Sequence, residues 1–575
     1  MVGTDDHDRG GRPAFDAAES APSLALSCLA CRARKLKCDR AKPSCSRCAK
    51  LRDSCEYPSS RRRNVGARKT VKDLEDRIAQ LESQAGAPSQ VIIPDSNGPM
   101  AGFRNLAPAP HGESRTNDST PPAQHPELSG SGDLIRLGLF EQLPPPQLMQ
   151  ELIDIYFDKM HSAAPMLHRA RFTASLHLPH PIRPPVCLQY IVMAIAAATT
   201  EAYAHMAMPF YRRARAYAEA DEVKCHGECF TTVPHAQCWC LIANFEGQQT
   251  MFSLASVSLA RSLRIAQMLE LHRLDYESRL LPLPLPGPRN WSELEERRRT
   301  WWVIFCSDRF VSATTGWPTL ISENDIHTLL PASEDAFSSG VEERQPPLRS
   351  AFHQDWATCS SFAGRVLAAQ IFHRTLEHSF ERFDDSGRRD RSFGTFWDQH
   401  KVIDDDLTLL LAFLPSDLRL PENYKSQNAV FVNMMLHSAV ICLHKAALGY
   451  DGQPPPHERF ISQSQDRLLP AAEEILEAFR IMINVHEVLR NPLMSFAAYM
   501  AGTVFLDHFA MTQAYTSERN LDFLLRIMVG AGKNNPVARS MIVQLGTDMR
   551  HHGLNLPIME QARLRSPAFA VACHI

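Results

Sequence analysis

Six cysteines between residues 28 and 55 constrain the fold of this chain more than any other feature, because they repeat one short pattern. Their spacing is C-x2-C-x6-C-x6-C-x2-C-x6-C, in which C-x2-C-x6-C occurs twice. Each half supplies three thiolates, whereas tetrahedral zinc prefers four ligands. Two ions become four-coordinate if one cysteine of each half bridges both metals. The spacing therefore predicts a cluster of two Zn²⁺ ions held by Cys28, Cys31, Cys38, Cys45, Cys48 and Cys55.

Two alternatives to a shared cluster remain open from the spacing: two independent structural metal sites, or redox-active thiols without a role in DNA binding. The charge around the cysteines argues against both. Residues 28–72 contain fifteen Lys and Arg against three acidic residues, a net charge of +12 in a chain whose total is −3. The rest of the chain therefore carries −15. This asymmetry indicates that the cysteine module binds a polyanion, and the same cations would stabilise thiolates.

Residues 28–55 resemble, without a gap, the fungal Zn2Cys6 family that is typified by the yeast galactose-pathway activator. The resemblance implies that Cys28 and Cys45 bridge the two ions, and that Pro43 stands in the loop between the halves, often after a cis peptide bond. It also implies that 32–37 forms a short helix whose C-terminal end enters the major groove of double-stranded DNA. Lys35, with Arg34 beside it, would then contact guanines of a CGG-like triplet, because guanine offers two acceptors in that groove.

The other basic side chains of the module are assigned to DNA phosphates, which position a protein without specifying sequence. These residues are Arg32, Lys37, Arg40, Lys42, Arg47 and Lys50. For each of them, a solvated surface charge is the alternative interpretation.

Three segments connect the module to the rest of the chain, after a tail at 1–27 that is predicted to be disordered. Residues 56–70 form a basic linker, and residues 86–133, with eight prolines, are predicted to be a second disordered linker. Between them, 71–85 shows a short heptad pattern, for which a single surface helix is the alternative. Members of the resembled family dimerise through such a segment, so we expect a homodimer. Its seam would consist of the apolar heptad residues Val71, Leu74, Ile78 and Leu81.

The body, residues 134–575, is predicted to be all-α because apolar residues recur there with a helical period and strand alternation is scarce. Helices are expected near 148–156, 254–272, 300–311, 354–382, 427–448, 463–489, 494–515 and 535–550. Parts of 152–168, 264–273 and 295–326 resemble the fungal-specific regulatory (middle homology) domain. The most recognisable of these residues are Trp301-Trp302, Asp308-Arg309 and Gly316-Trp317-Pro318. The resemblance implies an all-helical domain that controls activity by sensing metabolites or partners, and it makes these residues fold markers.

Two groups in the body invite a binding role that the sequence does not support. Arg297, Arg298 and Arg299 are expected to pair on a helix surface with Glu293, Glu295 and Glu296, in preference to binding an anion. The second group fits no ligand spacing for a third metal site, so its cysteines are interpreted as small core residues. It comprises Cys225, His226, Cys229, His235, Cys238 and Cys240.

Enzymatic and membrane functions are not expected from the sequence. A Gly-rich phosphate loop, a G-x-S-x-G motif and an H-E-x-x-H motif are all missing from it. The longest purely apolar run, 191–198, is far shorter than the ~20 residues of a membrane helix. The first ten residues are polar and do not predict a secretory signal, so we expect an intracellular protein.

The combined features predict a nuclear, sequence-specific DNA-binding transcription factor of the RNA polymerase II type, with an all-α regulatory domain, a small N-terminal binuclear zinc-cluster domain, a short coiled coil and disordered linkers. We expect an activator whose partners are double-stranded DNA, a second copy of the chain, the transcription machinery and a small-molecule effector. Control of a secondary-metabolite biosynthetic gene cluster is the favoured pathway, because many relatives of this architecture have that role. A nutrient-utilisation pathway is the rival, and a zinc-dependent protein-interaction module is the alternative from another class.

Overall fold

A computed structural model describes residues 27–34, 37–51, 54–57, 143–179, 182–224, 229–276, 285–352, 356–381, 396–449, 459–532 and 535–559. The chain divides into two compact units, Met1–Pro94 and Asp95–Ile575. The heptad residues Val71, Leu74, Ile78 and Leu81 and the linker 86–133 lie outside the described residues, as do 1–26 and most of 56–70. The described parts contain helices and no strand, which confirms the predicted fold class.

The N-terminal unit contains two short helices, α1 (Leu29–Ala33) and α2 (Ser46–Leu51). Each helix follows directly on a fully buried cysteine, Cys28 or Cys45. A hydrogen bond from the Leu29 backbone N–H to the Glu56 carbonyl, 2.8 Å long, joins the two ends of the module. In the described part of this unit, the buried side chains are cysteines, so the thiols occupy the place of a hydrophobic core. Folding of such a module depends on bound metal.

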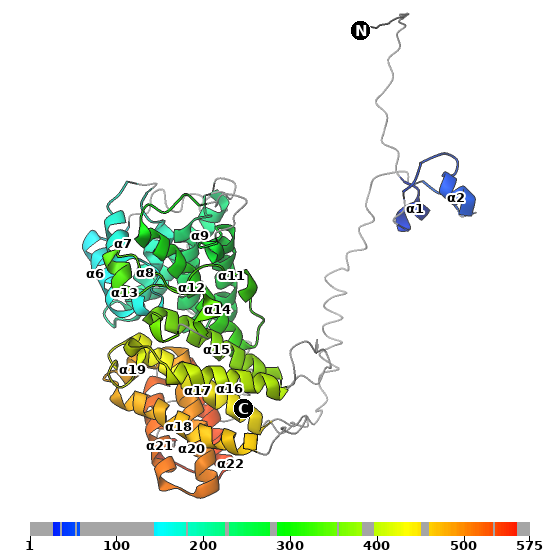
Figure 1. Cartoon of the computed structure of the whole chain (residues 1–575). Coiled ribbons are helices and arrows are strands. Elements are labelled where there is room, and N and C mark those ends of the chain that lie inside the picture. Colours follow the sequence, from blue (N-terminus) through cyan, green and yellow to red (C-terminus); the bar gives the residue numbers. More distant parts are fainter. Residues whose placement is uncertain are drawn as a thin grey trace, which may run out of the picture. The chain divides into compact units, whose positions relative to one another are not determined.

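The C-terminal unit is a body of packed helices with one large hydrophobic core (Figure 1). Its longer helices are α6 (Pro146–Lys159), α8 (Val186–Ala198), α9 (Ala204–Val223), α10 (Val233–Gln248), α11 (Phe252–Met268), α12 (Trp291–Thr315), α15 (Ser361–Glu381), α16 (Phe396–Ala412), α17 (Gln427–Leu448), α18 (Arg459–Ile481), α20 (Pro492–Thr512), α21 (Tyr515–Gly532) and α22 (Pro536–His551). The short helices are α7 (Arg169–Ser175), α13 (Glu334–Ser339), α14 (Leu348–Ser350) and α19 (Val485–Val488).

Neighbouring helices along the chain pack in pairs, α8 with α9, α10 with α11 and α17 with α18. Helices α12 and α15 pack against each other, and α15 continues the contact to α17. The chain colours of Figure 1 follow this order, from α6 to α15 at one end of the body to α16 to α22 at the other. Helix α12 thereby links the helices that precede it to the C-terminal half of the body.

Every helix expected from periodicity has a counterpart: α17 has the expected bounds 427–448, and the others have shifted ends. The expected helix at 463–489, for example, is α18 followed by the separate short helix α19, and the one at 354–382 begins as α15 at residue 361. Helices α8, α9, α10, α16 and α21 were not predicted. In α8, eleven of thirteen residues are buried, so it has no polar face and no amphipathic period to detect.

Among the described residues, α17 is the one helix that is long and apolar enough to cross a membrane by length and composition. Its most apolar stretch is 89% buried inside the body, which is the environment of a core helix.

Candidate metal centre and DNA-binding surface

The thiols of the N-terminal module gather at one point between its two halves. Sγ of Cys28 lies 3.8 Å from Sγ of Cys45 and 3.7 Å from that of Cys48, and Sγ of Cys31 lies 3.7 Å from that of Cys45. Cys38 Sγ lies 3.8 Å from Cys28 Sγ. In a zinc tetrahedron with Zn–S bonds of about 2.3 Å, two sulfurs are about 3.8 Å apart. The spacing of the thiols therefore fits zinc ligation.

Backbone N–H groups point at the same sulfurs. Cys31 N–H donates to Cys28 Sγ at 3.5 Å, and Cys48 N–H donates to Cys45 Sγ at 3.4 Å. These are equivalent positions in the two halves, so the duplication in the sequence is also a duplication in structure. Cys45 N–H donates to Cys55 Sγ at 3.2 Å, and this bond, the largest cause, lowers the pKa of Cys55 to about 7. Such bonds favour the thiolate, the form that binds metal.

Burial, in contrast, raises the pKa of a thiol. It raises the pKa of Cys31, which is 2% exposed. A cluster of buried thiolates is stable only when cations compensate its charge. Two Zn²⁺ ions meet this requirement and leave six thiolates with a net charge of −2, beside a strongly basic surface. The module binds two zinc ions.

Two supporting residues were not singled out from the sequence. The carboxylate of Asp39 accepts the N–H of Ser46, the first residue of α2, with its two oxygens at 3.1 and 3.2 Å. Hydrogen bonds from the Ser46 side chain and then from this N–H lower the pKa of Asp39. Tyr57 donates its hydroxyl hydrogen to the Ala41 carbonyl at 2.8 Å and so ties the end of the module to the loop between its halves. Asp39 lies seven positions before α2, too far to be a cap signal in the sequence, and the Tyr57 contact has no local signature either.

The structure describes most, but not all, of the residues that are predicted to contact DNA. The Lys42–Pro43 peptide bond is cis, as the family resemblance implies. Lys35 lies outside the described residues, and the side chain of Arg32 is likewise not described. The remaining basic side chains are all exposed, so each can reach a phosphate or a base edge: Arg34, Lys37, Arg40, Lys42, Arg47 and Lys50.

In the helical body, Asp308 and Arg309 of α12 hold the turn that follows the helix. Helix α12 ends at Gly316, whose φ of 71° is the left-handed conformation that glycine adopts without strain. The Asp308 carboxylate accepts the N–H groups of Leu320 and Ile321 at 3.1 and 3.3 Å. Arg309 donates to the Ile321 carbonyl at 3.1 Å. The motif therefore has a structural role, as expected for a fold marker.

The arginine run at the start of α12 is paired as predicted, but it is not on the surface. Arg297 Nη2 lies 3.0 Å from Glu293 Oε1, and Arg298 Nη1 lies 3.4 Å from Glu295 Oε2. The side chains of both arginines are less than 10% exposed. The expectation of exposed pairs was wrong because other segments of the body cover α12 on each of the sides that carry these consecutive residues, which periodicity alone did not reveal.

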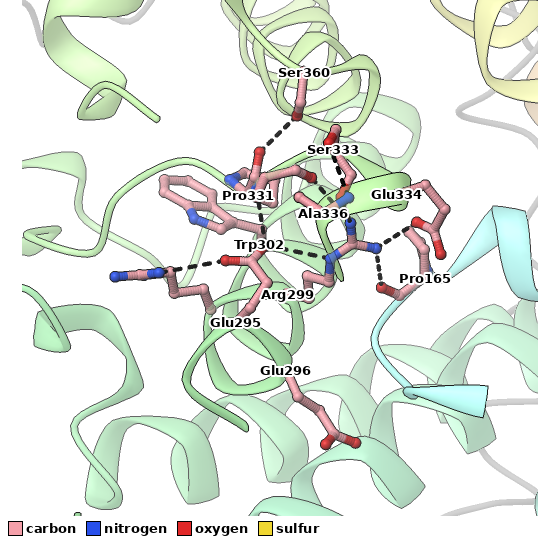
Figure 2. Close-up of polar contacts among 12 residues, drawn as sticks. Pro165, Glu295, Glu296, Arg299, Trp302, Pro331, Ser333, Glu334, Ala336 and Ser360 are labelled. Carbon is pink, nitrogen blue, oxygen red and sulfur yellow. Dashed lines mark hydrogen bonds and ion pairs between the residues drawn. The ribbon is translucent and has the colours of Figure 1, made fainter. Parts of the chain in front are cut away.

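Arg299 is the most deeply placed of the three and its side chain is fully buried (Figure 2). Its guanidinium group lies 3.3 Å from Glu295 Oε1 and 2.6 Å from Glu334 Oε2. It also donates to the carbonyl oxygens of Pro165, Ala332 and Ser333. Glu296, which was expected to join this group, instead pairs with Arg171 at 3.1 Å. Every donor of Arg299 is satisfied by protein atoms, so none remains for an anionic ligand.

The sequence matches two protein-family models that correspond to these two units. Residues 26–64 match the fungal Zn(2)-Cys(6) binuclear cluster domain, and residues 153–377 match the fungal specific transcription factor domain. The chain belongs to the fungal Zn2Cys6 transcription factors. Members of this family bind DNA to regulate transcription, so the chain is a DNA-binding transcription factor and not an enzyme.

Curated relatives share this architecture along most of their length. The pigment biosynthesis transcriptional activator pigB of Monascus ruber is 25% identical, over 82% of this chain and 85% of the relative. The citrinin biosynthesis transcriptional activator ctnR of Monascus purpureus is 26% identical, with the same coverage. The sorbicillinoid biosynthetic cluster transcription factor 1 of Penicillium rubens is 25% identical, over 91% of this chain and 93% of the relative.

Proposed function

We propose that this transcription factor activates the genes of one secondary-metabolite biosynthetic cluster. The observation that carries the proposal is the similarity over more than four-fifths of the chain to regulators named for pigment, citrinin and sorbicillinoid biosynthesis. Since each match covers more than four-fifths of the chain, it includes most of the regulatory body.

The six cysteines are proposed as the ligands of the two zinc ions, with Cys28 and Cys45 as the bridging thiolates. Support comes from the position of Cys28, whose Sγ is within 3.8 Å of thiols from both halves, Cys38 and Cys48. Both proposed bridging thiols are fully buried and both accept a backbone N–H. Zinc supplies no reaction here; it fixes the two helices of the module relative to each other so that their basic side chains form one surface.

That surface is proposed to bind CGG-like triplets in double-stranded DNA. Arg34 and Lys35, which follow α1 (Leu29–Ala33) in the sequence, would read the guanines, while the other exposed lysines and arginines of the module contact phosphates. One triplet gives too little affinity and specificity for a promoter site. We therefore propose that the chain acts in the nucleus as a homodimer through the heptad residues of 71–85, which brings two modules to paired triplets. The remaining proposed partners are the transcription machinery and a small-molecule effector of the body.

Two measurements test the proposed pathway. Chromatin immunoprecipitation of the full chain should recover promoters of biosynthetic genes close to its own gene, and deletion of the gene should silence them. Selection of random DNA by the purified full chain should enrich paired CGG-like triplets. Binding confined to promoters of nutrient-utilisation genes would support the rival pathway, and failure to enrich any DNA would contradict the proposed readout.

A further inference from the structure

Three neighbouring helices of the regulatory body bring a thiol, a carboxylate and an imidazole together. Cys187 is in the first turn of α8, Asp221 is in the last turn of α9, and His235 is in the first turn of α10. Helix α8 packs against both α9 and α10. The three residues are thus brought to one place by the fold, although 34 positions separate Cys187 from Asp221 and 14 separate Asp221 from His235.

The distances among the three ligand atoms suit a small metal ion. Sγ of Cys187, a carboxylate oxygen of Asp221 and Nε2 of His235 all lie within 4.8 Å of one another. His235 Nε2 lies 3.2 Å from Asp221 Oδ2, and Cys187 Sγ lies 4.0 Å from the same oxygen. Bonds of about 2.0 Å to nitrogen and oxygen and about 2.3 Å to sulfur place tetrahedral ligand atoms roughly 3.3 to 3.6 Å apart. The three ligand atoms fit a tetrahedral zinc site if the Cys187 thiol moves slightly closer to the Asp221 carboxylate.

Hydrogen bonds to the outward-facing atoms of His235 and Asp221 orient these two side chains, as is typical of metal ligands. The second ring nitrogen of His235, Nδ1, is 2.8 Å from the hydroxyl oxygen of Thr232. The second oxygen of Asp221, Oδ1, accepts a hydrogen bond from Lys224 Nζ at 2.6 Å. Ligating histidines and carboxylates are held by such partners on the atom that does not face the metal. These contacts leave Nε2 and Oδ2 directed toward Cys187.

Charge and burial also suit a divalent cation. Cys187 is fully buried and His235 is 6% exposed, while the side chain of Asp221 is 16% exposed. One thiolate and one carboxylate neutralise a charge of +2, so the occupied cluster adds no net charge to the interior. The partial exposure of Asp221 leaves that side of the cluster open to solvent.

We propose that Cys187, Asp221 and His235 bind a Zn²⁺ ion in the regulatory body, with a water molecule as the fourth ligand. The ion replaces a proton on His235 Nε2 and another on Cys187 Sγ, and Nδ1–H then donates to Thr232. Binding ties α8, α9 and α10 together at their ends. The set shares only His235 with the cysteine-rich group noted in the sequence. Of that group, Cys225 and His226 lie outside the described residues, Cys238 and Cys240 are buried in α10, and Cys229 is exposed, so its interpretation as a core residue was wrong.

The test counts zinc in the full-length protein, purified with a thiol reductant, by native mass spectrometry and elemental analysis. Wild type should hold three ions per chain, two in the cysteine module and one in the body. Cys187→Ser, His235→Gln and Asp221→Asn should each hold two. Cys442→Ser, which removes an equally buried thiol from α17, should keep three. Asp221→Asn keeps the shape of the side chain and one acceptor oxygen, so it disturbs the fold least and remains informative if the other variants misfold.

A further variant separates this proposal from the proposed zinc module. Cys45→Ser should lose the two module ions and keep one, and adding Asp221→Asn to it should remove that last ion. If Cys45→Ser alone holds none, or if Asp221→Asn holds as many ions as wild type, then Cys187, Asp221 and His235 form a metal-free hydrogen-bonded cluster and the proposal fails. Cobalt in place of zinc gives a second readout in the Cys45→Ser background, where the module is expected to hold no ion: a four-coordinate spectrum with a thiolate charge-transfer band that the further change Cys187→Ser removes.

Discussion

Sγ of Cys28 lies 3.8 Å from Sγ of Cys45, although seventeen positions separate the two residues in the chain. Each is the first cysteine of its half, each directly precedes a short helix, and each accepts an N–H from the residue three positions later. The two thiols are therefore related by the duplication and face each other across it. A pair in this relationship can be shared between two metal ions, whereas a thiol at the margin of the module cannot.

The first prediction follows from that sharing. Cys45→Ser in the full chain should remove both module ions and most of the folding of the module, because a bridging ligand serves both metals. DNA binding should be lost, while the thermal transition of the body remains. Native mass spectrometry counts the ions, and Cys442→Ser is the control for removal of a buried thiol elsewhere. Loss of only one ion would mean that the two sites do not share Cys45.

A second prediction separates base readout from phosphate contact. Lys35→Ala should relax the preference for the guanine-rich triplet at a cost of ~1–3 kcal/mol, because a donor pair to guanine is lost. Lys50→Ala should weaken binding to all sequences alike and reduce its dependence on salt. Equilibrium binding to matched triplet and scrambled duplexes distinguishes the two. A uniform loss for both variants would make Lys35 a phosphate contact.

A third prediction is that Asp308 contributes strongly to the folding stability of the body. Asp308→Ala removes the acceptor of two backbone N–H groups and leaves the adjacent Arg309, which is 2% exposed, without its nearest carboxylate. Removing one partner of a buried ion pair costs about 3–5 kcal/mol. Thermal unfolding of the body measures the loss, with exposed Asp417→Ala as the control that should change little.

A fourth prediction concerns acid stability and His400. This side chain is 2% exposed, and burial, followed by the charges of His444 and His378, lowers its pKa to about 3. In the unfolded chain an ordinary histidine has a pKa of about 6.5, so the unfolded state binds more protons below that pH. Stability should therefore be complete above about pH 6.5 and fall as the pH decreases toward 3, by at most about 1.4 kcal/mol per pH unit for this site.

The variant His400→Gln isolates that contribution. Its unfolding midpoint should fall less steeply than that of wild type between about pH 6.5 and pH 4.5, because no proton is taken up at this position on unfolding. Exposed His552→Gln should keep the slope of wild type. Equal slopes for wild type and His400→Gln would show that His400 is not neutral in the folded body or that its pKa is not lowered.

How much could be predicted from the sequence differs between the two units. In the zinc module the two ions, the six clustered cysteines and the duplication all follow from spacing, because a metal cluster imposes its own short-range geometry. In the body, amphipathic helices such as α11 and α18 were predicted, whereas α8 was not, since a helix buried on all sides has no polar face. Periodicity indicates which face of a helix is apolar but not what covers its polar residues, which is why the burial of Arg299 was missed.

The cluster of Cys187, Asp221 and His235 could not be predicted from the sequence either. Each residue is unremarkable in its own segment, and no spacing rule connects positions on three different helices. The cysteine-rich stretch before α10 did draw attention to His235, but its ligand partners come from α8 and α9. Only the packing of those helices brings the three side chains together.

The last prediction concerns dimerisation, which rests on residues 71–85 outside the described parts of the structure. Leu74, Ile78 and Leu81 would bury a narrow seam, and two heptads are too few to hold a dimer at low concentration. DNA changes that balance, because two modules on adjacent triplets raise the local concentration of the heptads. We therefore expect the full chain to bind paired triplets cooperatively.

Replacing Leu74 and Leu81 with serine should abolish this cooperativity and leave binding to a single triplet nearly unchanged, because the zinc module itself is intact. Exchanging the exposed-position residues Gln80 and Ser83 for alanine is the matched control, since neither lies at an a or d position of the heptads. Quantitative gel-shift titration of single and paired sites measures both quantities. If the double serine variant still binds paired triplets cooperatively, the dimer contact lies in the helical body. If wild type shows no cooperativity at any spacing or orientation of the triplets, the chain reads DNA as a monomer and 71–85 is only a surface helix.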